Sequence, residues 1–243
     1  MATFTPSRLR GKAALITGAS RGIGLALAHA LAAEGCSLVV TGRNRSALIR
    51  AGRELEKHRV TVLIVACDIR DPAAVDSLQQ QIRGCFRQLD ILINNAGVGQ
   101  PHQNVDQLNY RIWREVMATN LDGLFLVTHA VLPLMKRGGT IVNNLSIAAK
   151  RVFPGSSAYN ASKHGALGLT NTLREELRPR GIRVIALMPG ATDTAIWKTL
   201  WPEAPRRKMM SAETVAMAVV NALKLPPESV AEELLLLPAA GTL

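Results

Sequence analysis

The stretch that decides the fold is AALITGASRGIG, which runs from Ala13 to Gly24. A short apolar run leads into a turn whose three glycines are spaced Gly-x-x-x-Gly-x-Gly, and a helical pattern follows at once. Such glycines let the backbone turn sharply and approach a pyrophosphate, which then lies on the helix N-terminus. Glycine also serves ordinary turns, but the position between a first strand and a first helix favours a nucleotide site. The residues expected to bind are Gly18, Ser20, Arg21, Gly22, Ile23 and Gly24.

Short apolar runs alternate with longer helical segments along the rest of the chain. The runs are rich in Val, Ile and Leu, as expected for strands buried on both faces of a parallel sheet. They comprise residues 13–17, 37–41, 61–66, 91–94, 140–145, 183–188 and 233–237. Helices are expected at 23–34 and 73–86, the second after the capping pair Asp71-Pro72. The pattern predicts an α/β, Rossmann-like doubly wound parallel sheet of about seven strands with helices on both faces. Residues 1–243 are expected to form one domain.

The composition argues against several other classes of protein. The net charge is +11, but the basic residues are scattered and the longest basic run is only Arg206 to Lys208. Aromatic residues make up 4% of the chain, which leaves little material for stacking bases. We therefore interpret the charge as solvated surface and expect no nucleic-acid partner.

The cysteines and apolar runs indicate the compartment. Cys36, Cys67 and Cys85 are too few and too irregularly spaced for a disulfide framework, and the first two adjoin strand-like runs as expected for buried thiols. The first ten residues lack a signal-peptide core, and apolar runs such as Leu234 to Leu237 are far shorter than a bilayer span. A cytoplasmic protein without a membrane partner or a metal is expected.

The end of the second strand bears on the choice of dinucleotide. NAD sites usually carry a carboxylate there for the ribose 2′-hydroxyl, but this chain reads Thr41-Gly42-Arg43-Asn44-Arg45. Arg43 can fork onto a 2′-phosphate, and Arg21 can reach the same group from the glycine turn. The alternative is that both are surface arginines. The absence of a carboxylate there, together with two suitably placed arginines, favours NADP(H).

A tyrosine and a lysine form a second candidate constellation. Tyr159 and Lys163 are four residues apart, which places them on one face of a helix that begins near Ser157. A nearby ammonium lowers the pKa of a phenol, so such a pair can exchange protons. Ser146 ends a strand upstream, where its hydroxyl can hold an oxygen that develops negative charge. Alone, the spacing also fits a packed tyrosine beside a solvated lysine.

In combination these motifs resemble the single-domain short-chain dehydrogenase/reductases. The resemblance covers the chain from about residue 9 to its end, and it rests on ordered matches of several short motifs. They are Thr17 to Gly24, Asp68, Asn94-Asn95-Ala96-Gly97, Asn120, Ser146, Tyr159, Lys163 and Pro189-Gly190. One residue departs from the pattern, because Asn144 stands where an apolar residue is expected after Asn143.

The resemblance implies a role for each matching residue in cofactor binding. Asp68 would bond the adenine, with the backbone of Ile69 beside it. The run Asn95, Ala96 and Gly97 would line the cofactor. Lys163 and Tyr159 would lie at the nicotinamide ribose, and the nicotinamide end would be contacted by Pro189, Gly190 and Thr192.

The resemblance also implies a mechanism that transfers a hydride between the nicotinamide and a carbonyl or secondary alcohol. Ser146 would orient the carbonyl and Tyr159 would protonate it. Asn120 would distort its helix and hold a water that links Lys163 to solvent. Relatives usually form homotetramers, or dimers, through two long helices, here near 106–136 and 157–178.

The substrate is less well indicated. Residues 192–211 follow a strand without clear periodicity, and we interpret them as a substrate lid rather than an ordinary connection. Phe153, Trp197 and Trp201 are candidates for the apolar wall of a substrate pocket, with Val152 and Leu200. Lys150, Arg151 and residues 206–208 can meet an anionic group, but we favour solvated surface. A 3-oxoacyl or small ketone substrate is expected.

Other functions stay open. The C-terminal sequence differs from that of acyl-carrier-protein reductases, so a dehydrogenase of a small hydroxy acid is one alternative. A non-catalytic NADPH-binding sensor or scaffold is another, since fold alone does not fix function. The combination of Ser146, Tyr159 and Lys163 argues against the sensor, which has no need of a proton donor.

Overall fold

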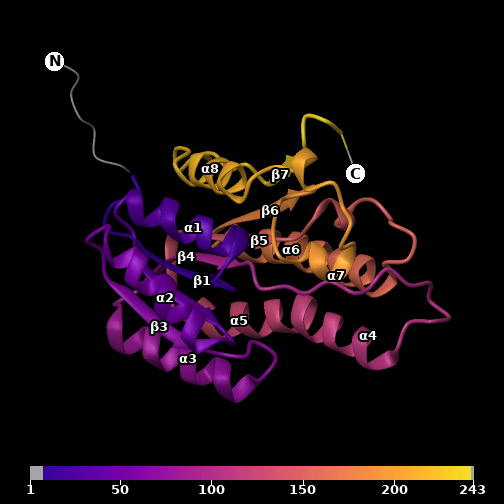
Figure 1. The fold of residues 1–243 in the computed structure, drawn as a ribbon. Helices are drawn as coiled ribbons and strands as arrows, with labels where there is room; N and C mark the ends of the chain where they lie inside the picture. Colours follow the sequence, from indigo (N-terminus) through magenta and orange to yellow (C-terminus); the bar gives the residue numbers. More distant parts are fainter. Residues whose placement is uncertain (1–7, 242–243) are drawn as a thin grey trace.

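Seven parallel strands form a single sheet in the computed structural model, which describes residues 8–241. The order is β3-β2-β1-β4-β5-β6-β7, so the direction of winding reverses between β1 and β4. The strands are β1 (Ala13–Thr17), β2 (Ser37–Gly42), β3 (Val62–Ala66), β4 (Leu89–Asn94), β5 (Met135–Asn144), β6 (Arg183–Pro189) and β7 (Glu233–Leu236). Figure 1 shows the sheet between two layers of helices, which confirms the predicted fold class. Ligands of such folds bind beside the point of reversal, at the carboxyl ends of the strands.

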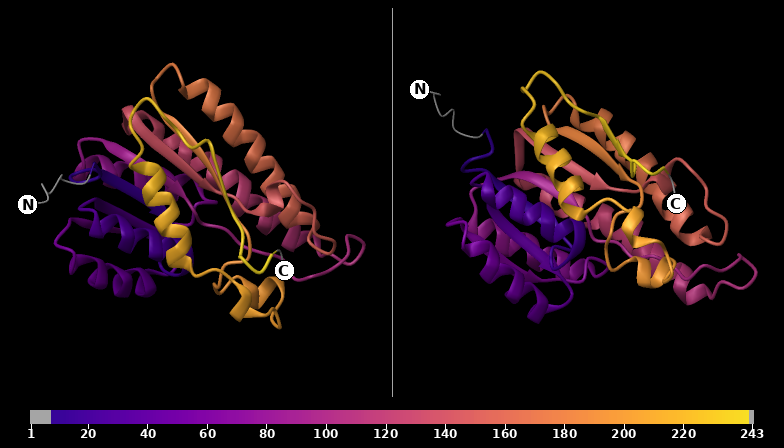
Figure 2. Two further views of the ribbon diagram at one scale, coloured as in Figure 1. Left: turned by 90° about the horizontal axis from the view of Figure 1, so that it is seen from above. Right: turned by 45° about the horizontal axis from the view of Figure 1, so that its top comes forward.

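Each face of the sheet is covered by its own set of helices (Figure 2). One face packs on α1 (Gly22–Ala33), α2 (Arg45–Glu56) and α8 (Ala212–Leu223), and the other on α3 (Pro72–Cys85), α5 (Gly123–Val131) and α6 (Ser157–Leu177). Successive strand residues alternate between the faces, so that Ile16 joins the first cluster and Leu15 the second. Burial on both faces explains why the strands are almost continuously apolar.

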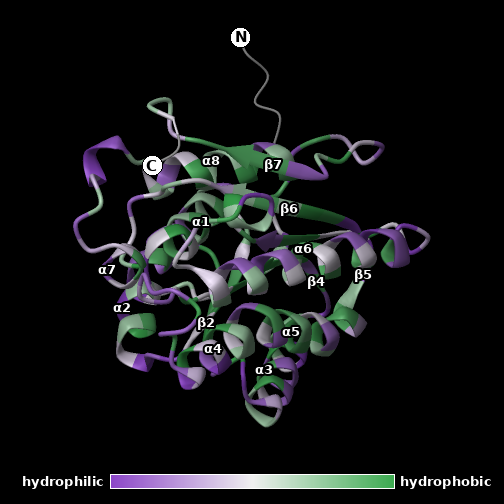
Figure 3. Ribbon diagram, turned by 90° about the vertical axis from the view of Figure 1, so that its right-hand side faces the viewer, coloured by the Kyte–Doolittle hydropathy of each residue, from purple (hydrophilic) through white to green (hydrophobic). Residues whose placement is uncertain are grey.

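Local capping signals begin two of the helices, and the start of α3 is the one that the sequence predicts. The Asp71 side chain accepts from the Ala73 amide at 3.0 Å, with Pro72 in the first turn of α3. Asn44 accepts from the Ala47 amide at 2.9 Å and so caps α2. Figure 3 shows green and purple together on helices such as α3 and α6, as expected for helices with one buried and one solvated side.

The helix expected at 106–136 is shorter and is interrupted. It comprises α4 (Tyr110–Met117), a π-helical turn (Ala118–Asp122) and α5, and a 3₁₀ turn with Pro133 ends it. Asn109 caps α4 through the Arg111 amide, so the helix begins after 106. The predicted C-terminal end is wrong because Lys136 already belongs to β5, which pairs with β4 from Met135 onward.

One helix among the described residues, Tyr110–Leu134, is long and apolar enough to cross a membrane by length and composition. The short apolar runs of the sequence did not predict a helix of this length and hydrophobicity. Its residues Leu124, Val127 and Val131 are buried in the core, and α5 contacts β4 and α3. These contacts are those of a core helix, which can match a membrane-spanning helix in length and composition.

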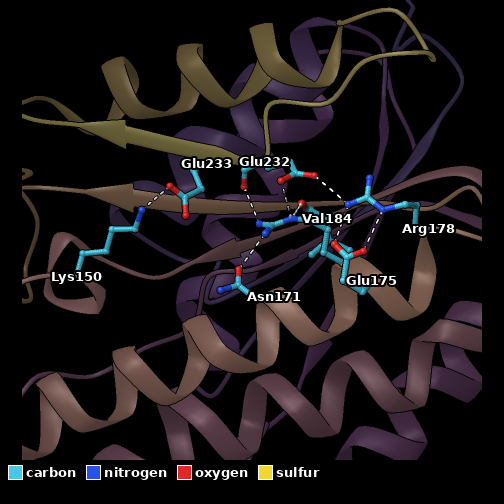
Figure 4. Close-up of polar contacts among 8 residues, drawn as sticks. Lys150, Asn171, Glu175, Arg178, Val184, Glu232 and Glu233 are labelled. Carbon is cyan, nitrogen blue, oxygen red and sulfur yellow. Dashed lines mark hydrogen bonds and ion pairs between the residues drawn. The ribbon is translucent and has the colours of Figure 1, made fainter.

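The edge strand β7 is held by charged side chains of α6 (Figure 4). The Arg174 guanidinium donates to the carbonyls of Val184 and Glu232 at 3.2 and 2.9 Å, which joins α6, β6 and the start of β7. Arg178 forms ion pairs with Glu175 and Glu232 at 2.8 and 3.1 Å. This network fixes the last strand although its side chains alternate between half-buried and exposed.

Candidate active site

The glycine turn after β1 is closely packed. Gly18 and Gly22 have φ of +67° and +56°, in the left-handed region that favours glycine. A Cβ on Gly24 would lie 2.4 Å from Asn95 Nδ2 and 2.5 Å from the Gly18 oxygen. The turn therefore requires glycine at these positions, because backbone and a fixed amide occupy the space of a side chain.

The turn is joined to the end of β4 by Thr17 and Asn95. The Thr17 hydroxyl accepts from the amides of Asn95 and Ala96, both at 2.9 Å. The Asn95 side chain donates to the Thr17 carbonyl at 2.8 Å and to that of Gly18 at 3.3 Å. These bonds cross the point where the strand order reverses, and they fix the shape of the loops that meet there.

The first turn of α1 leaves backbone donors for a ligand. Arg21 precedes it in an extended conformation and gives no side-chain cap, whereas α2, α3, α4 and α8 are capped by a side chain. The uncapped N–H groups and the glycines that let the backbone approach fit a pyrophosphate. Gly18, Ser20, Gly22, Ile23 and Gly24 are the residues that would hold it.

Four charged residues gather beyond the ends of β2 and β3. Asp68 accepts a forked contact from Arg70, with Nε at 2.9 Å from Oδ1 and Nη2 at 2.6 Å from Oδ2. Glu115 of α4 lies 3.9 Å from Arg43 and 3.8 Å from Arg70. The Arg70 guanidinium lowers the pKa of the Asp68 carboxyl.

Sequence reasoning missed Arg70 and Glu115. The only signal for Arg70 is its position two residues after Asp68. For Glu115 there is none, because it comes from a helix distant in sequence. Arg21 is exposed, and no hydrogen bond or ion pair of its side chain is present among residues 8–241.

The tyrosine and the lysine lie in the first turns of α6, as predicted. The Lys163 ammonium lies 5.6 Å from the centroid of the Tyr159 ring and donates to the Asn144 carbonyl at 3.1 Å. The Ser146 hydroxyl hydrogen-bonds the Tyr159 phenol and accepts from the Ala148 amide at 3.1 Å. The end of β5 and the start of α6 thus bring Ser146, Tyr159 and Lys163 together.

The direction of the Tyr159 pKa shift is opposite to the one expected from sequence. Burial raises the pKa of the phenol, and the hydrogen bond of Ser146 opposes this only in part. Burial also lowers the pKa of Lys163 to about 8. The expectation was wrong for this state because burial disfavours the charged form of each group and is the largest cause of both shifts. Tyr159 is a protonated donor in this structure.

Asn120 lies in the π-helical turn between α4 and α5, so the expected distortion of its helix is confirmed. Its side chain accepts from the Val98 amide at 2.9 Å and donates to the Val98 carbonyl at 2.9 Å and to Ser162 Oγ at 3.1 Å. A Cβ on Gly97 would lie 3.3 Å from Asn120 Oδ1 and 3.7 Å from Lys163 Nζ. Asn120 therefore lies beside the lysine and ties the loop after β4 to α6.

Two further polar residues position this constellation. Gln100 is fully buried, accepts from the Tyr159 amide at 3.0 Å and donates to the Gly155 carbonyl at 3.1 Å. The sequence did not predict this role of Gln100, because no neighbouring residue indicates that a side chain from this loop caps a helix far along the chain. Asn144 donates to Asn95 Oδ1 at 2.8 Å, which is the polar contact that explains its departure from the family pattern.

Residues 192–211 cover the carboxyl edge of the sheet. They contain two short elements that the sequence did not indicate, α7 (Trp197–Leu200) and a 3₁₀ turn (Arg206–Lys208). A Cβ on Gly22 would meet Thr194 at 3.2 Å, and one on Gly99 would meet Leu200 at 2.7 Å. The segment thus packs on the loops that follow β1 and β4, where a lid over the site would lie.

The candidate substrate residues differ in how deeply they are buried and how firmly they are held. Trp197 donates from its indole to the Thr192 carbonyl at 2.8 Å, which anchors its ring at the start of the segment. Phe153 is half-buried in the loop before α6, while Trp201 is 44% exposed. Pro189 ends β6 and Gly190 packs against Leu237, beside the same edge.

Two of the basic residues near the site, Lys150 and Arg206, have acidic partners. Lys150 forms an ion pair with Glu233 at 2.5 Å, as Figure 4 shows. Arg206 pairs with Asp193 and donates to the Thr194 carbonyl at 2.8 Å. Both cations are partly exposed, as expected for surface residues, but each is paired with a carboxylate there.

Comparison with known protein families places the chain in one of them. The sequence model of the short chain dehydrogenase family matches residues 12–205. The chain belongs to the short-chain dehydrogenase/reductase family. It is therefore an oxidoreductase that acts on carbonyl or alcohol groups with a nicotinamide cofactor, on a small-molecule substrate.

Relatives within this family differ in substrate and cofactor. Sulfoacetaldehyde reductase 2 of Chromohalobacter salexigens is 40% identical over 186 residues, which are 74% of this chain and 72% of that protein. The alcohol dehydrogenase of Thermococcus sibiricus, complexed with 5-hydroxy-NADP, superposes with a TM-score of 0.88 at 31% identity over 94% of this chain and 97% of its own. The 3-ketoacyl-(acyl-carrier-protein) reductase of Brucella melitensis, complexed with NADH, gives 0.86 at 30% identity over 95% and 98%.

Proposed function

We propose that this short-chain dehydrogenase/reductase reduces small carbonyl compounds and prefers NADPH to NADH. The preference is supported by Arg43 after β2, because the stretch Gly42 to Arg45 has no acidic residue of its own to accept from a ribose 2′-hydroxyl. Arg70 adds a second guanidinium within reach of Glu115, the carboxylate that Arg43 also contacts. Two arginines suit a 2′-phosphate because a guanidinium binds phosphate in a forked geometry.

The observation that carries the catalytic assignment is the Ser146–Tyr159–Lys163 constellation. Bound nicotinamide would supply the hydride, and Lys163 and Tyr159 would hold its ribose. Ser146 orients the substrate oxygen, and Tyr159 donates the phenol proton to that oxygen as negative charge develops on it. The raised pKa keeps Tyr159 protonated at neutral pH until the substrate oxygen accepts its proton.

Lys163 would assist the proton transfer through its charge. When a phenolate forms, its attraction for the ammonium increases, so the charged lysine stabilises the product of proton donation. The carbonyl of Asn144 accepts from Nζ and fixes its position. Asn120 lies beside this ammonium, and we propose that it holds the water that returns a proton to the site.

The substrate we propose is a 3-oxoacyl compound or another small ketone or aldehyde. Phe153, Trp197 and Trp201 offer apolar surface for its chain, and residues 192–211 would cover it as a lid. A small hydroxy acid or a sulfonated aldehyde is the second candidate, and it is favoured by the 40% identity to a sulfoacetaldehyde reductase. The pairs of Lys150 with Glu233 and of Arg206 with Asp193 argue against it, because a substrate anion would first have to displace those carboxylates.

We also propose a cytoplasmic homotetramer. Cys36, Cys67 and Cys85 are free thiols, which suits a reducing compartment, and burial raises the pKa of the first two to about 12 and about 11. Phe125 on α5 and Tyr110 on α4 are exposed, as residues of a helix-to-helix contact between copies would be. Light scattering of a monomer at micromolar concentration would contradict this assembly.

The test is NADPH oxidation by the purified protein with an acetoacetyl thioester, a small ketone and sulfoacetaldehyde, each repeated with NADH. We expect turnover with NADPH, and a loss of about 10²- to 10⁴-fold in Tyr159→Phe at nearly unchanged NADPH affinity. Tyr110→Phe, at the other tyrosine of the chain, is the matched control and should keep full activity. Full activity of Tyr159→Phe would refute the mechanism, and NADPH binding without turnover of any carbonyl would favour a sensor.

A further inference from the structure

The charged cluster at the adenosine end of the site contains a carboxylate where an anionic ligand is expected. Glu115 Oε1 lies 3.9 Å from Arg43 Nη1 and 3.8 Å from Arg70 Nη1, so one oxygen is shared by two guanidinium groups. The two arginines follow different strands, β2 and β3, and Glu115 reaches them from α4. A single anion thus bridges loops that are adjacent only in the folded chain.

The remaining member of the cluster sets the balance of charge. Asp68 binds Arg70 through two of its nitrogens at 2.6 to 3.1 Å, far closer than Glu115 does. Arg43 has no other ion pair among the described residues. Two positive and two negative groups therefore cancel, and Glu115 is the one ion-pair partner of Arg43 among the described residues, although Asp68 also attracts Arg43 from a longer distance.

From this geometry we infer that Glu115 is a specificity-determining residue, an internal anion that competes with the cofactor 2′-phosphate for Arg43 and Arg70. The inference rests on the proposed use of NADPH. A 2′-phosphate must displace the Glu115 carboxylate from the two arginines, whereas the neutral 2′-hydroxyl of NADH has no charge to exchange with it. Glu115 then reduces the preference that Arg43 confers and keeps NADH usable.

The contacts are long and exposed, which limits the size of the effect. The side chains of Arg43 and Glu115 are 53% and 49% exposed, and exposed ion pairs are weak because water screens them. Without the Glu115 carboxylate, a 2′-phosphate would no longer have to break two such ion pairs or approach a negative charge. We therefore expect removal of that charge to raise the affinity for a 2′-phosphate about three- to tenfold. The gain should shrink as salt is added.

The experiment compares Glu115→Gln with wild type by titration of four ligands, NADPH, NADH, 2′,5′-ADP and 5′-AMP, at low and high salt. Binding is followed by calorimetry, so the result does not depend on turnover. Glu228→Gln removes one negative charge from an exposed loop residue that has no ion pair with Arg43 or Arg70, and it is the matched control. We expect Glu115→Gln to bind NADPH and 2′,5′-ADP about three- to tenfold more tightly at low salt, and NADH and 5′-AMP within about twofold of wild type.

Three outcomes would overturn the inference. Equal tightening of ligands with and without the 2′-phosphate, or the same change in Glu228→Gln, would indicate a general charge effect. Unchanged NADPH with weakened NADH would make Glu115 a ribose ligand instead. A gain that persists at high salt would indicate a structural change rather than competition.

The design separates this inference from the proposed function. If wild type prefers NADPH but Glu115→Gln changes no ligand selectively, the cofactor proposal stands and the role of Glu115 fails. If wild type prefers NADH and the variant still gains for 2′,5′-ADP, the competition stands and the cofactor proposal fails.

Discussion

Lys163→Met tests how much the burial of a charged Lys163 side chain lowers the stability of the folded protein. Methionine keeps the length and most of the volume of the side chain but removes its charge. Burial lowers the pKa of Lys163 from 10.5 to about 8 in the folded protein, while the unfolded chain keeps the ordinary value. A pKa difference of one between the two states corresponds to about 1.4 kcal/mol, so the charged lysine costs the fold about 3 kcal/mol.

The sign follows from the protons bound in each state. Below pH 8 both states carry the proton and the full cost of burial is present. Between about 8 and 10.5 the folded state has lost the proton that the unfolded state still binds, so wild-type stability rises with pH. The stability of Lys163→Met relative to wild type should therefore fall by about 3 kcal/mol across this window.

Urea unfolding of the cofactor-free protein, followed by tryptophan fluorescence across this pH range, measures the difference. Tyr159 titrates in both proteins, so its contribution largely cancels. Lys136→Met, at an exposed lysine on β5, is the control and should give a constant difference. If the difference for Lys163→Met were also constant with pH, the lysine would not be desolvated, and the reasoning from its burial would be refuted.

Further predictions concern the framework of the site, each measured by urea unfolding. Gly24→Ala should lower the free energy of unfolding by about 1–3 kcal/mol or more and weaken NADPH binding, because its Cβ would lie 2.4 Å from Asn95 Nδ2. Gly84→Ala should raise the free energy of unfolding by up to about 1 kcal/mol, because nothing lies within 4 Å of the added Cβ. Equal losses of stability in the two variants would contradict the steric argument. Thr17→Val should cost about 1–3 kcal/mol for each of the two amides it leaves without an acceptor; a neutral result would mean that water replaces the hydroxyl. Asp71→Ala should cost about 1 kcal/mol through loss of the α3 cap without changing NADPH affinity.

Features encoded in short stretches of sequence could be predicted well. The apolar runs indicated all seven strands, and the Asp71-Pro72 pair indicated the start of α3. The spacing of Tyr159 and Lys163 placed both in the first turns of α6, because helical periodicity is a local property. The extended start of β5 and the early end of α5 were missed, since pairing of Met135 with Leu89 decides them.

The sequence by itself determined the class of fold, the glycine turn, and the types of side chain available for proton transfer. Tertiary structure decided how those side chains behave. Burial reversed the expected direction of the Tyr159 pKa, and Gln100 and Asn144 became positioning residues through contacts with distant loops. The pairing of Glu115 with Arg43 also arises only in the folded chain. Local patterns specify strands, turns and helix faces, whereas desolvation and the pairing of charges depend on which segments the complete fold brings together.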